Sequence, residues 1–501
     1  MITKNENKSL NTMQVVSIDD LVPKDHLVRK LAKTIDFEFI RDKVKYLYSD
    51  CTGRPSIDPV VLFKIVFIQF LFGIKSMRKT ISEIEVNAAY RWYLGFDFSD
   101  PIPHYSTFSQ NYRRRFADSN IFSEIFEEIL KQVIKKGLLS EDTIFVDSTH
   151  IKAYANKRKA DEKYVKEDTN RYVKALQDEL NKIRTEEGKK EINFNTVKKV
   201  AVSRTDPESG MFHKGEKEKQ FAYSVQTACD KNGWIVGCKT YPGNVNDNNA
   251  GVDFIIPYLE KHPKVDYTLM DAGYTGSLII NEILNRGRVP IVPYVRPKGL
   301  RSNGLFKKNF KFDQEKNEYT CPYGKKLTYK GVNTQGYLQY KSSKKDCDGC
   351  PFKSNCTKSS TKTLTRHLLE NTKNITRDIR LSEVGREKYE LRKKTIERVF
   401  ADCKMNHCLG FTLVRGLKKN ENRNLIIFAM ANYKKMANLL HRNGMNISNY
   451  FFKTIISKLK SYKVTIKNLI NQKKGAKILF LTPFCQHSET THSGWFAFLL
   501  Y

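Results

Sequence analysis

Three acidic residues, widely spaced in the sequence, lie in patterns that suit metal-dependent chemistry on phosphates. Asp147 follows the strand-like run 143–146 and precedes Ser148 and Thr149, which suit a turn, and Asp271 follows a second apolar strand-like run. Glu397 lies at the edge of an apolar stripe on an amphipathic helix predicted over 381–409. Two carboxylates from adjacent strand ends and one from a helix form a ligand set that suits Mg²⁺, which prefers oxygen donors. Two such ions can clamp the attacking and leaving oxygens of a phosphoryl displacement, so the pattern predicts nuclease or strand-transfer chemistry.

Each acid considered alone has a simpler structural explanation. An Asp at a strand end is more often a turn former or a helix cap than a metal ligand. A Glu among lysines on a helix is more often solvated. The metal hypothesis therefore requires that the three acids converge in the folded chain.

The elements expected between the first two acids allow such convergence. A hairpin is predicted over 220–241, followed by a loop at 242–249 and a helix over 252–261. Parallel neighbouring strands need a long connection of this kind. We therefore expect the strands of Asp147 and Asp271 to lie side by side.

Charge is the strongest global feature of the chain. Its 501 residues have room for roughly two to four domains and carry a formal net charge of +33, from 87 Lys plus Arg against 54 Asp plus Glu. A surplus of this size is best tolerated by a protein that works against a polyanion, and nucleic acid is the first expectation, although a membrane surface or a ribosome would also fit. The chain shows no signal-like start and no run that would span a bilayer, so its 10 cysteines indicate reduced thiols or metal ligands. These observations predict a cytoplasmic protein with no membrane partner.

A mostly helical region is predicted over 15–137. Its segment 59–74 is apolar nearly all round, which is typical of a buried helix. Ser106 is expected to cap a short helix with three consecutive arginines, and a longer helix follows over 123–136. Such a pair is typical of a helix-turn-helix that presents arginines to phosphates; the alternative is a solvated basic turn between packing helices. The three arginines are Arg113, Arg114 and Arg115.

Two segments are expected as insertions into the sheet-forming part. The first, at 155–215, is highly charged and predicted to be exposed and mobile, with a helix near 172–184. The second, at 297–380, is too long for a plain loop and is expected to have its own structure. It carries four cysteines, which suffice for a tetrahedral structural Zn²⁺; free or redox-labile thiols are the alternative. These are Cys321, Cys347, Cys350 and Cys356.

Together these motifs resemble the DDE transposases of bacterial insertion sequences, specifically the group with an N-terminal helical domain, an RNase H-like core and a Cys-bearing insertion before the last acid. The resemblance runs from about residue 20 to about residue 440. The motifs that carry it, in chain order, are Gly53-Arg-Pro-Ser-Ile-Asp-Pro59, His104-Tyr-Ser-Thr107 with the arginines after it, Phe145-Val-Asp-Ser-Thr149, Pro242-Gly-Asn-Val245, Asp271-Ala-Gly-Tyr274 and Ile396-Glu-Arg-Val-Phe400 with Lys404.

The resemblance implies an α/β catalytic core of RNase H-like type, a mixed sheet flanked by helices, with an all-α N-terminal domain and a small Cys-stapled insertion. The expected domains are a helical DNA-binding domain at 15–137, a first part of the core at 138–296 with the charged insertion at 155–215, the Cys-containing insertion domain at 297–380, a second part of the core with the Glu helix at 381–442, and a basic extension at 443–501. The apolar tail at 477–501 has no assigned role.

The resemblance also implies the site. It assigns catalysis and metal binding to Asp147, Asp271 and Glu397, which would hold two Mg²⁺ ions, with Mn²⁺ as an alternative. It assigns DNA binding to the three N-terminal arginines and to a signature on the last helix. Within that signature, Arg392 stands at the family's distance from the preceding Tyr. Lys393 stands at the family's distance from the acid. Which of the two contacts DNA therefore stays open. The signature residues are Tyr389, Arg392, Lys393 and Lys404.

The implied reaction has two steps. Water attacks the phosphodiester at each transposon end, and the freed 3′-hydroxyl then attacks target DNA. The implied partners are the terminal inverted repeats and the target DNA, and the joining of two ends implies a homodimer on DNA. The setting is the bacterial cytoplasm, in association with the nucleoid.

Two other functions stay open. An RNase H-like nuclease or resolvase would hydrolyse DNA without joining it. A zinc-containing DNA-binding relative would retain the basic surfaces while its acids are idle.

Overall fold

The computed structural model describes Met13, residues 15–49, Gly53, and residues 55–166, 171–194, 197–214, 218–293 and 304–442. All of these fall within one compact unit, Met1–Arg442. The extension predicted at 443–501, including the apolar tail at 477–501, lies outside the described residues. Among the helices that the structure describes, none combines the length and apolar character needed to cross a membrane.

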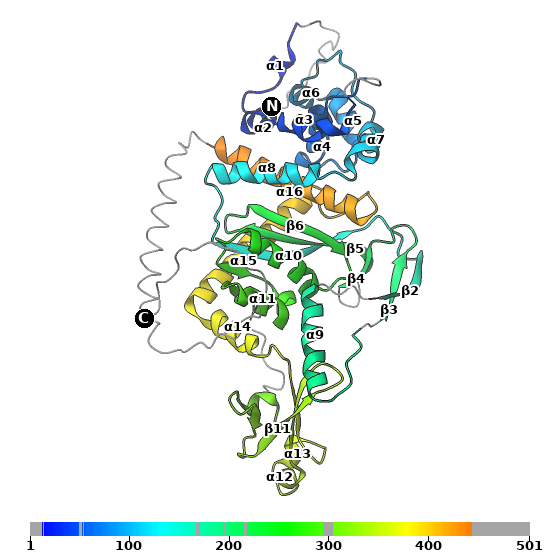
Figure 1. Cartoon of the computed structure of the whole chain (residues 1–501). Coiled ribbons are helices and arrows are strands. Elements are labelled where there is room, and N and C mark those ends of the chain that lie inside the picture. Colours follow the sequence, from blue (N-terminus) through cyan, green and yellow to red (C-terminus); the bar gives the residue numbers. More distant parts are fainter. Residues whose placement is uncertain are drawn as a thin grey trace, which may run out of the picture. The chain divides into compact units, whose positions relative to one another are not determined.

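The N-terminal region is helical, as predicted (Figure 1). The segment expected to be a buried helix forms α4, which begins where Asp58 caps it by accepting a hydrogen bond from the Val60 amide at 2.9 Å, with Pro59 in the first turn. Most faces of this helix are covered, because most of its apolar side chains are buried. The elements of this region are α1 (Ile18–Leu21), α2 (Leu27–Thr34), α3 (Phe39–Val44), η1 (Lys45–Leu47), α4 (Pro59–Leu71), α5 (Met77–Val86), α6 (Ala88–Leu94), α7 (Ser106–Asn111), η2 (Tyr112–Phe116) and α8 (Ile121–Lys135).

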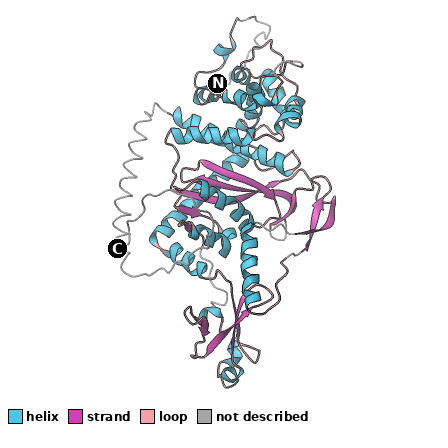
Figure 2. Ribbon diagram, in the orientation of Figure 1, coloured by secondary structure: helices cyan, strands magenta, loops and turns pink. Residues whose placement is uncertain are grey.

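A mixed six-stranded sheet forms the centre of the α/β part (Figure 2). The strand order is β4-β5-β1-β7-β8, with β6 paired to β5. Strand β1 is antiparallel to β5 and parallel to β7, so the prediction that the strands of the first two acids are parallel neighbours is confirmed. The strands are β1 (Thr143–Lys152), β4 (Gly210–Lys214), β5 (Glu218–Asp230), β6 (Ile235–Pro242), β7 (Tyr267–Leu269) and β8 (Val289–Ile291).

Strand β1 differs from the prediction at its end. We expected Ser148 and Thr149 to turn the chain after Asp147, but the strand continues to Lys152 and places Asp147 in its middle. The residues after Asp147 pair in register with β5, Ser148 with Gln226 among them. Ladder hydrogen bonds to a long neighbouring strand therefore outweigh the local turn preference of these residues.

Five helices and one 3₁₀ turn pack around the sheet. One of them, α10, begins five residues before the helix predicted over 252–261, because the Asn246 side chain caps it by accepting from the Asn248 amide at 2.8 Å. The prediction of a loop over 242–249 is therefore wrong for its last three residues, which are helical. The elements are α10 (Asp247–Lys261), η3 (Ala272–Tyr274), α11 (Ser277–Asn285), α14 (Asn371–Leu381), α15 (Glu383–Asn406) and α16 (Leu417–Leu440).

Helix α16 joins the N-terminal helices to the sheet. It packs against α8, α2 and α4, and also against β6 (Figure 1). The Tyr433 hydroxyl donates to the Leu31 carbonyl at 2.6 Å, while the buried Asn432 amide bonds both the N–H and the C=O of Ile235, at 3.0 and 2.8 Å. One continuous hydrophobic core consequently runs through the N-terminal helices and the sheet.

The two insertions both contain regular structure. In the first, strands β2 and β3 form a separate two-stranded ribbon. The helix predicted near 172–184 forms α9. The second has a five-stranded sheet of order β13-β12-β11-β10-β9 with a small apolar core of its own. The elements are β2 (Ala160–Lys166), α9 (Arg171–Glu186), β3 (Val197–Ser203), η4 (Lys307–Asn309), β9 (Lys311–Asp313), β10 (Glu318–Thr320), β11 (Lys326–Val332), β12 (Leu338–Ser342), α12 (Lys344–Asp348), α13 (Lys353–Cys356) and β13 (Thr363–Arg366).

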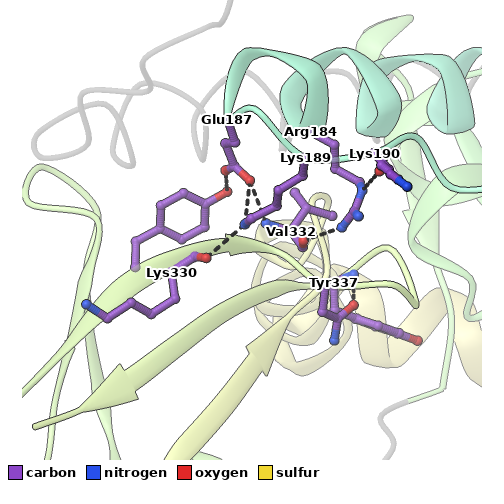
Figure 3. Close-up of polar contacts among 9 residues, drawn as sticks. Arg184, Glu187, Lys189, Lys190, Lys330, Val332 and Tyr337 are labelled. Atoms are coloured by element: carbon purple, nitrogen blue, oxygen red, sulfur yellow. Dashed lines mark hydrogen bonds and ion pairs between the residues drawn. The ribbon is translucent and has the colours of Figure 1, made fainter.

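A polar clasp joins the end of α9 to β11 (Figure 3). Arg184, only 7% exposed, donates to the carbonyls of Lys190 and Val332. Glu187 accepts from the Tyr329 hydroxyl and from the Val332 amide. The first insertion is therefore not free of the rest of the chain, because its helix is fixed to the Cys-bearing insertion.

Replacement of Arg184 tests this clasp. In Arg184→Ala the carbonyls of Lys190 and Val332 lose a charged donor, a loss of about 1.5–3 kcal/mol for hydrogen bonds of this kind. We expect the amides of β11 and β12 to exchange hydrogen faster in Arg184→Ala than in the parent protein. The exposed Lys174 on the same helix provides the control, and Lys174→Ala should leave exchange unchanged. Equal exchange in the parent and both variants would contradict the clasp.

Candidate active site

A buried guanidinium brings the first and last predicted acids together. Arg392 on α15 is 8% exposed and donates to Asp147 Oδ2 on β1 and, at 3.5 Å, to Glu397 Oε1 one turn further along its own helix. Residues 147 and 397 are thus within the span of one side chain. The long helix predicted over 381–409 forms α15 and supplies both Arg392 and Glu397.

The second predicted acid lies beside the first. Asp271 follows β7 and caps the 3₁₀ turn after it, where its Oδ1 accepts from the Gly273 amide at 2.8 Å. Burial raises the pKa of Asp271, and the Asp247 carboxylate adds to the effect, while the Gly273 hydrogen bond and Arg392 oppose it. The position at a strand end agrees with the prediction for this residue.

The acids repel one another in a poorly solvated site. Burial raises the pKa of Asp147 to about 6, and the charges of Asp271 and Asp247 act in the same direction. Arg392 and the Ser148 amide, which donates at 2.8 Å, lower it by less. Negative charge at this point is therefore only partly compensated by the protein itself.

A fourth carboxylate, absent from the sequence-based prediction, belongs to the same cluster. Asp247 is the first residue of α10, and its Oδ1 accepts from Gln226 Nε2 at 2.9 Å. Gln226 in turn accepts from the Tyr274 hydroxyl. Asp247 lies in the segment predicted as a loop at 242–249, and Asn246 before an apolar helical pattern is an N-cap signal that could have placed Asp247 on a helix.

Two turns of the chain interlock at this point. A Cβ on Gly273 would lie 2.9 Å from Asp247 Oδ2 and 3.0 Å from Asp271 Oδ1. A Cβ on Gly276 would lie 2.5 Å from Asn248 Oδ1, which accepts from the Gly276 amide at 2.7 Å. Both glycines are therefore required by close approach, and the start of α10 is fixed against the turn after β7.

The remaining signature residues differ in exposure. Glu397 is half exposed, with 51% of its side chain accessible, and Lys393 and Lys404 are exposed on the same helix. Tyr389 is partly buried, and the Arg380 guanidinium lies 4.3 Å from its ring centroid. Of the two candidates for a DNA contact, Lys393 faces solvent while Arg392 is occupied by the acids.

The N-terminal arginines lie on a distorted turn. Arg113 and Arg114 are exposed, whereas Arg115 bonds Asn111 and packs over the Tyr48 ring at 4.5 Å. The turn is a π-helical segment between α7 and α8. Ser106 lies inside α7 and does not cap it, which corrects that prediction; the His104 ring contacts the Ser106 hydroxyl instead.

The four cysteines of the second insertion lie within electrostatic reach of one another. Burial raises the pKa of the Cys356 thiol, Lys362 opposes this, and Cys347, Cys350 and Cys321 add to the increase. Cys347 Sγ lies 3.0 Å from the Ser342 hydroxyl. The thiols converge at one end of the small sheet without forming disulfides.

The acidic cluster suits a hard cation by its donors. In the described part of the chain, no three or more His, Cys, Asp or Glu residues lie in an arrangement that could hold a metal ion as the side chains stand. The cluster nonetheless offers only oxygen donors and an excess of negative charge, and the cationic Arg392 lies between two of them. The residues therefore fit a divalent cation chemically, provided that Arg392 or Glu397 shifts.

Two family models match the sequence. One, described as "Transposase domain (DUF772)", matches residues 16–114, and the other, described as "Transposase DDE domain", matches residues 320–437. Both matches are to transposase families, and the second is to their DDE domain. The matched segments contain the N-terminal helices, most of the Cys-bearing insertion and the helix of Glu397. Asp147 and Asp271 lie between them, so their roles rest on the geometry above.

Two solved structures resemble this chain only weakly. "Mos1 transposase paired-end complex with left transposon end" has 12% identity and a TM-score of 0.16, and covers 51% of this chain and 63% of that one. "Crystal structure of a pre-cleavage Mos1 transpososome" has 11% identity and a TM-score of 0.15, and covers 48% of this chain and 61% of that one. This chain thus spans somewhat under two thirds of each of these chains. No curated protein matches it.

Substitution of Asp147 should reveal the strain in the acidic cluster. The folded pKa of about 6 lies above the ordinary 3.8, so the folded state binds more protons than the unfolded state between these values and loses stability as pH rises through them. We expect Asp147→Asn to raise the unfolding free energy of the metal-free protein by on the order of 2 kcal/mol at pH 7. The gain should vanish near pH 4, as measured by thermal or urea unfolding.

Asp142, just before the same strand, provides a control of opposite sign. Burial acts to raise its pKa, but hydrogen bonds from Ser140 and Thr143 and the charge of Lys231 lower it to about 2. Asp142→Asn should therefore destabilise the protein at pH 7. Destabilisation by both substitutions at pH 7 would contradict the account of Asp147.

Proposed function

We propose that this protein is a transposase that cuts the ends of an insertion sequence and joins the freed 3′-hydroxyls to target DNA, with catalysis by Asp147, Asp271 and Glu397. The observation that carries the proposal is the meeting of Asp147 and Glu397 on Arg392, with Asp271 beside them. These residues come from three elements that are distant in sequence. A purely structural acid would not need two further carboxylates near it in a buried site.

The sheet supports an RNase H-like core. Its antiparallel β6, β5 and β1 continue into parallel β7 and β8, and Asp147 lies on the central β1. A chain built in this way places acids of β1 and of the turn after β7 at neighbouring strands. We propose the domain limits 15–137, 138–296, 297–380 and 381–442 on this basis, with the extension at 443–501.

The acids would hold two Mg²⁺ ions, or Mn²⁺, which supply charge stabilisation for the attacking and leaving oxygens of the phosphoryl transfer. Asp147 and Asp271 are fixed by β1 and by the capped turn after β7, so they can hold their positions without reorganisation. Glu397 is exposed and can move toward them along with α15. Arg392 would compensate part of the negative charge of the acids until a divalent cation replaces its charge.

DNA would approach the exposed cationic face of α15. Lys393 and Lys404 are accessible there and can neutralise backbone phosphates near the acids. Arg113 and Arg114 would bind phosphates of the terminal repeats, and Tyr389, whose ring contacts the Arg380 guanidinium of α14, would also contact DNA. Because two ends must be joined, we propose a homodimer on DNA, acting at the nucleoid in the cytoplasm.

The four cysteines would hold a structural Zn²⁺. Their convergence at one end of the small sheet, with a C-x₂-C pair at the end of α12, supports a tetrahedral thiolate site. A bound ion would stabilise an insertion whose own apolar core has only five buried residues.

A cleavage assay tests the proposed function. Purified protein, Mg²⁺ and DNA that carries the element's own ends should yield nicked ends and strand-transfer products. Asp147→Ala should abolish both products, by at least about a thousandfold, because removal of one ligand disables a site whose catalysis is electrostatic. DNA binding, measured by gel shift, should persist because the variant retains the basic surfaces.

The same assay separates the alternatives. Nicked ends without joined products would identify a nuclease or resolvase. Binding without Mg²⁺-dependent cleavage by the parent protein would identify an inactive relative. Cleavage by Asp147→Ala at the parent rate would refute the assignment of the site.

Elemental analysis tests the zinc proposal. We expect one Zn²⁺ per chain in the parent protein and none in the double variant Cys347→Ser/Cys350→Ser. Cys238→Ser, at a thiol remote from this group on β6, should retain the ion. A zinc-free parent protein purified without chelators, with four titratable thiols in the insertion, would contradict the proposal.

A further inference from the structure

We infer that Asp247 is a fourth carboxylate ligand of the divalent-cation centre, in addition to Asp147, Asp271 and Glu397. The inference deepens the proposed function and rests on it. It assigns a role to a residue at the first position of α10 that neither family match covers.

The Asp247 carboxylate is held by one oxygen and presents the other to the site. Its Oδ1 accepts from Gln226 Nε2 at 2.9 Å, and Gln226 is itself held by the buried Tyr274 hydroxyl. Its Oδ2 and Asp271 Oδ1 both lie within 3.0 Å of the point that a Cβ on Gly273 would occupy. A ligand oriented by a second layer of hydrogen bonds while one oxygen remains available is the usual arrangement in metal sites.

Electrostatics place the same group among the other acids. Besides burial, the Asp247 charge raises the pKa of Asp147 and of Asp271, and the charges of all three carboxylates raise the pKa of the buried Tyr274 hydroxyl. A fold that needed Asp247 only to begin a helix would gain nothing from such neighbours, because Asn246 already caps α10. Three carboxylates forced into one poorly solvated site are costly unless a cation compensates them.

Gly273 gives a second, steric line of support. Any side chain at this position would displace Asp247 Oδ2 or Asp271 Oδ1, since its Cβ would lie within 3.0 Å of both. Its φ does not require glycine. The absence of a side chain therefore keeps open the space that the two carboxylates share.

Metal titration of the full-length protein without DNA tests the inference. With Mn²⁺ as the probe and free Mn²⁺ read by electron paramagnetic resonance, Asp247→Asn should weaken binding at one site at least about tenfold. Gly273→Ala should weaken it similarly by displacing the same oxygen. Asp266→Asn, at an exposed carboxylate near β7, is the matched control and should bind as the parent does.

The stability of the metal-free protein distinguishes a ligand from a structural acid. Asp247→Asn keeps the shape and the Gln226 contact while removing a repelling charge, so its Tm should equal or exceed that of the parent. A lower Tm, or a failure to fold, would show that Asp247 serves the fold and would overturn the inference.

The outcomes also separate this inference from the proposed function. If Asp147→Asn weakens Mn²⁺ binding and Asp247→Asn does not, the centre exists but Asp247 is not part of it. If the parent protein binds no Mn²⁺, or if Asp147→Asn binds as the parent does, the proposed centre itself fails.

Discussion

Unbalanced negative charge in a poorly solvated site is the constraint around which this molecule is arranged. The charges of Asp271 and Asp247 add to the effect of burial in raising the pKa of Asp147, the Asp247 charge does the same for Asp271, and Arg392 is a cation that opposes both shifts. Within the described residues the Arg392 Nε is buried and lacks a hydrogen-bond partner. The guanidinium thus leaves one of its donors without a partner at this site.

The neighbouring backbone is shaped to keep these charges in place. Strand β5 pairs with β1 both before and after Asp147 and so fixes its position. The interlocked turns at Gly273 and Gly276 fix the start of α10. Of the four acids of the site, Glu397 on α15 is the exposed one, with 51% of its side chain accessible. The site therefore combines three fixed carboxylates with one adjustable carboxylate on a helix.

Much of this arrangement could be predicted from the sequence, because its main signals are local. The apolar run of α4, the hairpin of β5 and β6 and the periodic pattern of α15 each formed as expected. The parallel pairing of β1 and β7 followed from the length of the connection between them.

The errors arose where long-range contacts decide. Strand β1 continues past Asp147 because β5 pairs with it there, and nothing in residues 143–149 signals that partner. Asp247 was hidden in a stretch rich in Asn and Asp, although Asn246 carried a capping signal. The clasp between α9 and β11 joins residues that are 142 to 148 positions apart, which no local pattern specifies.

Helix α16 links the two ends of the described chain to each other. The N-terminal helices and the sheet share its surface, with Tyr433 bonded to one and Asn432 to the other. A fragment that stopped after α8 would leave the apolar faces of α2, α4 and α8 without their cover and would be prone to self-association. Because α16 packs against both parts, a tilt of the N-terminal helices would be transmitted through it to β6. If those helices tilt when they bind a DNA duplex, binding would be coupled to the geometry of the sheet that carries the acids.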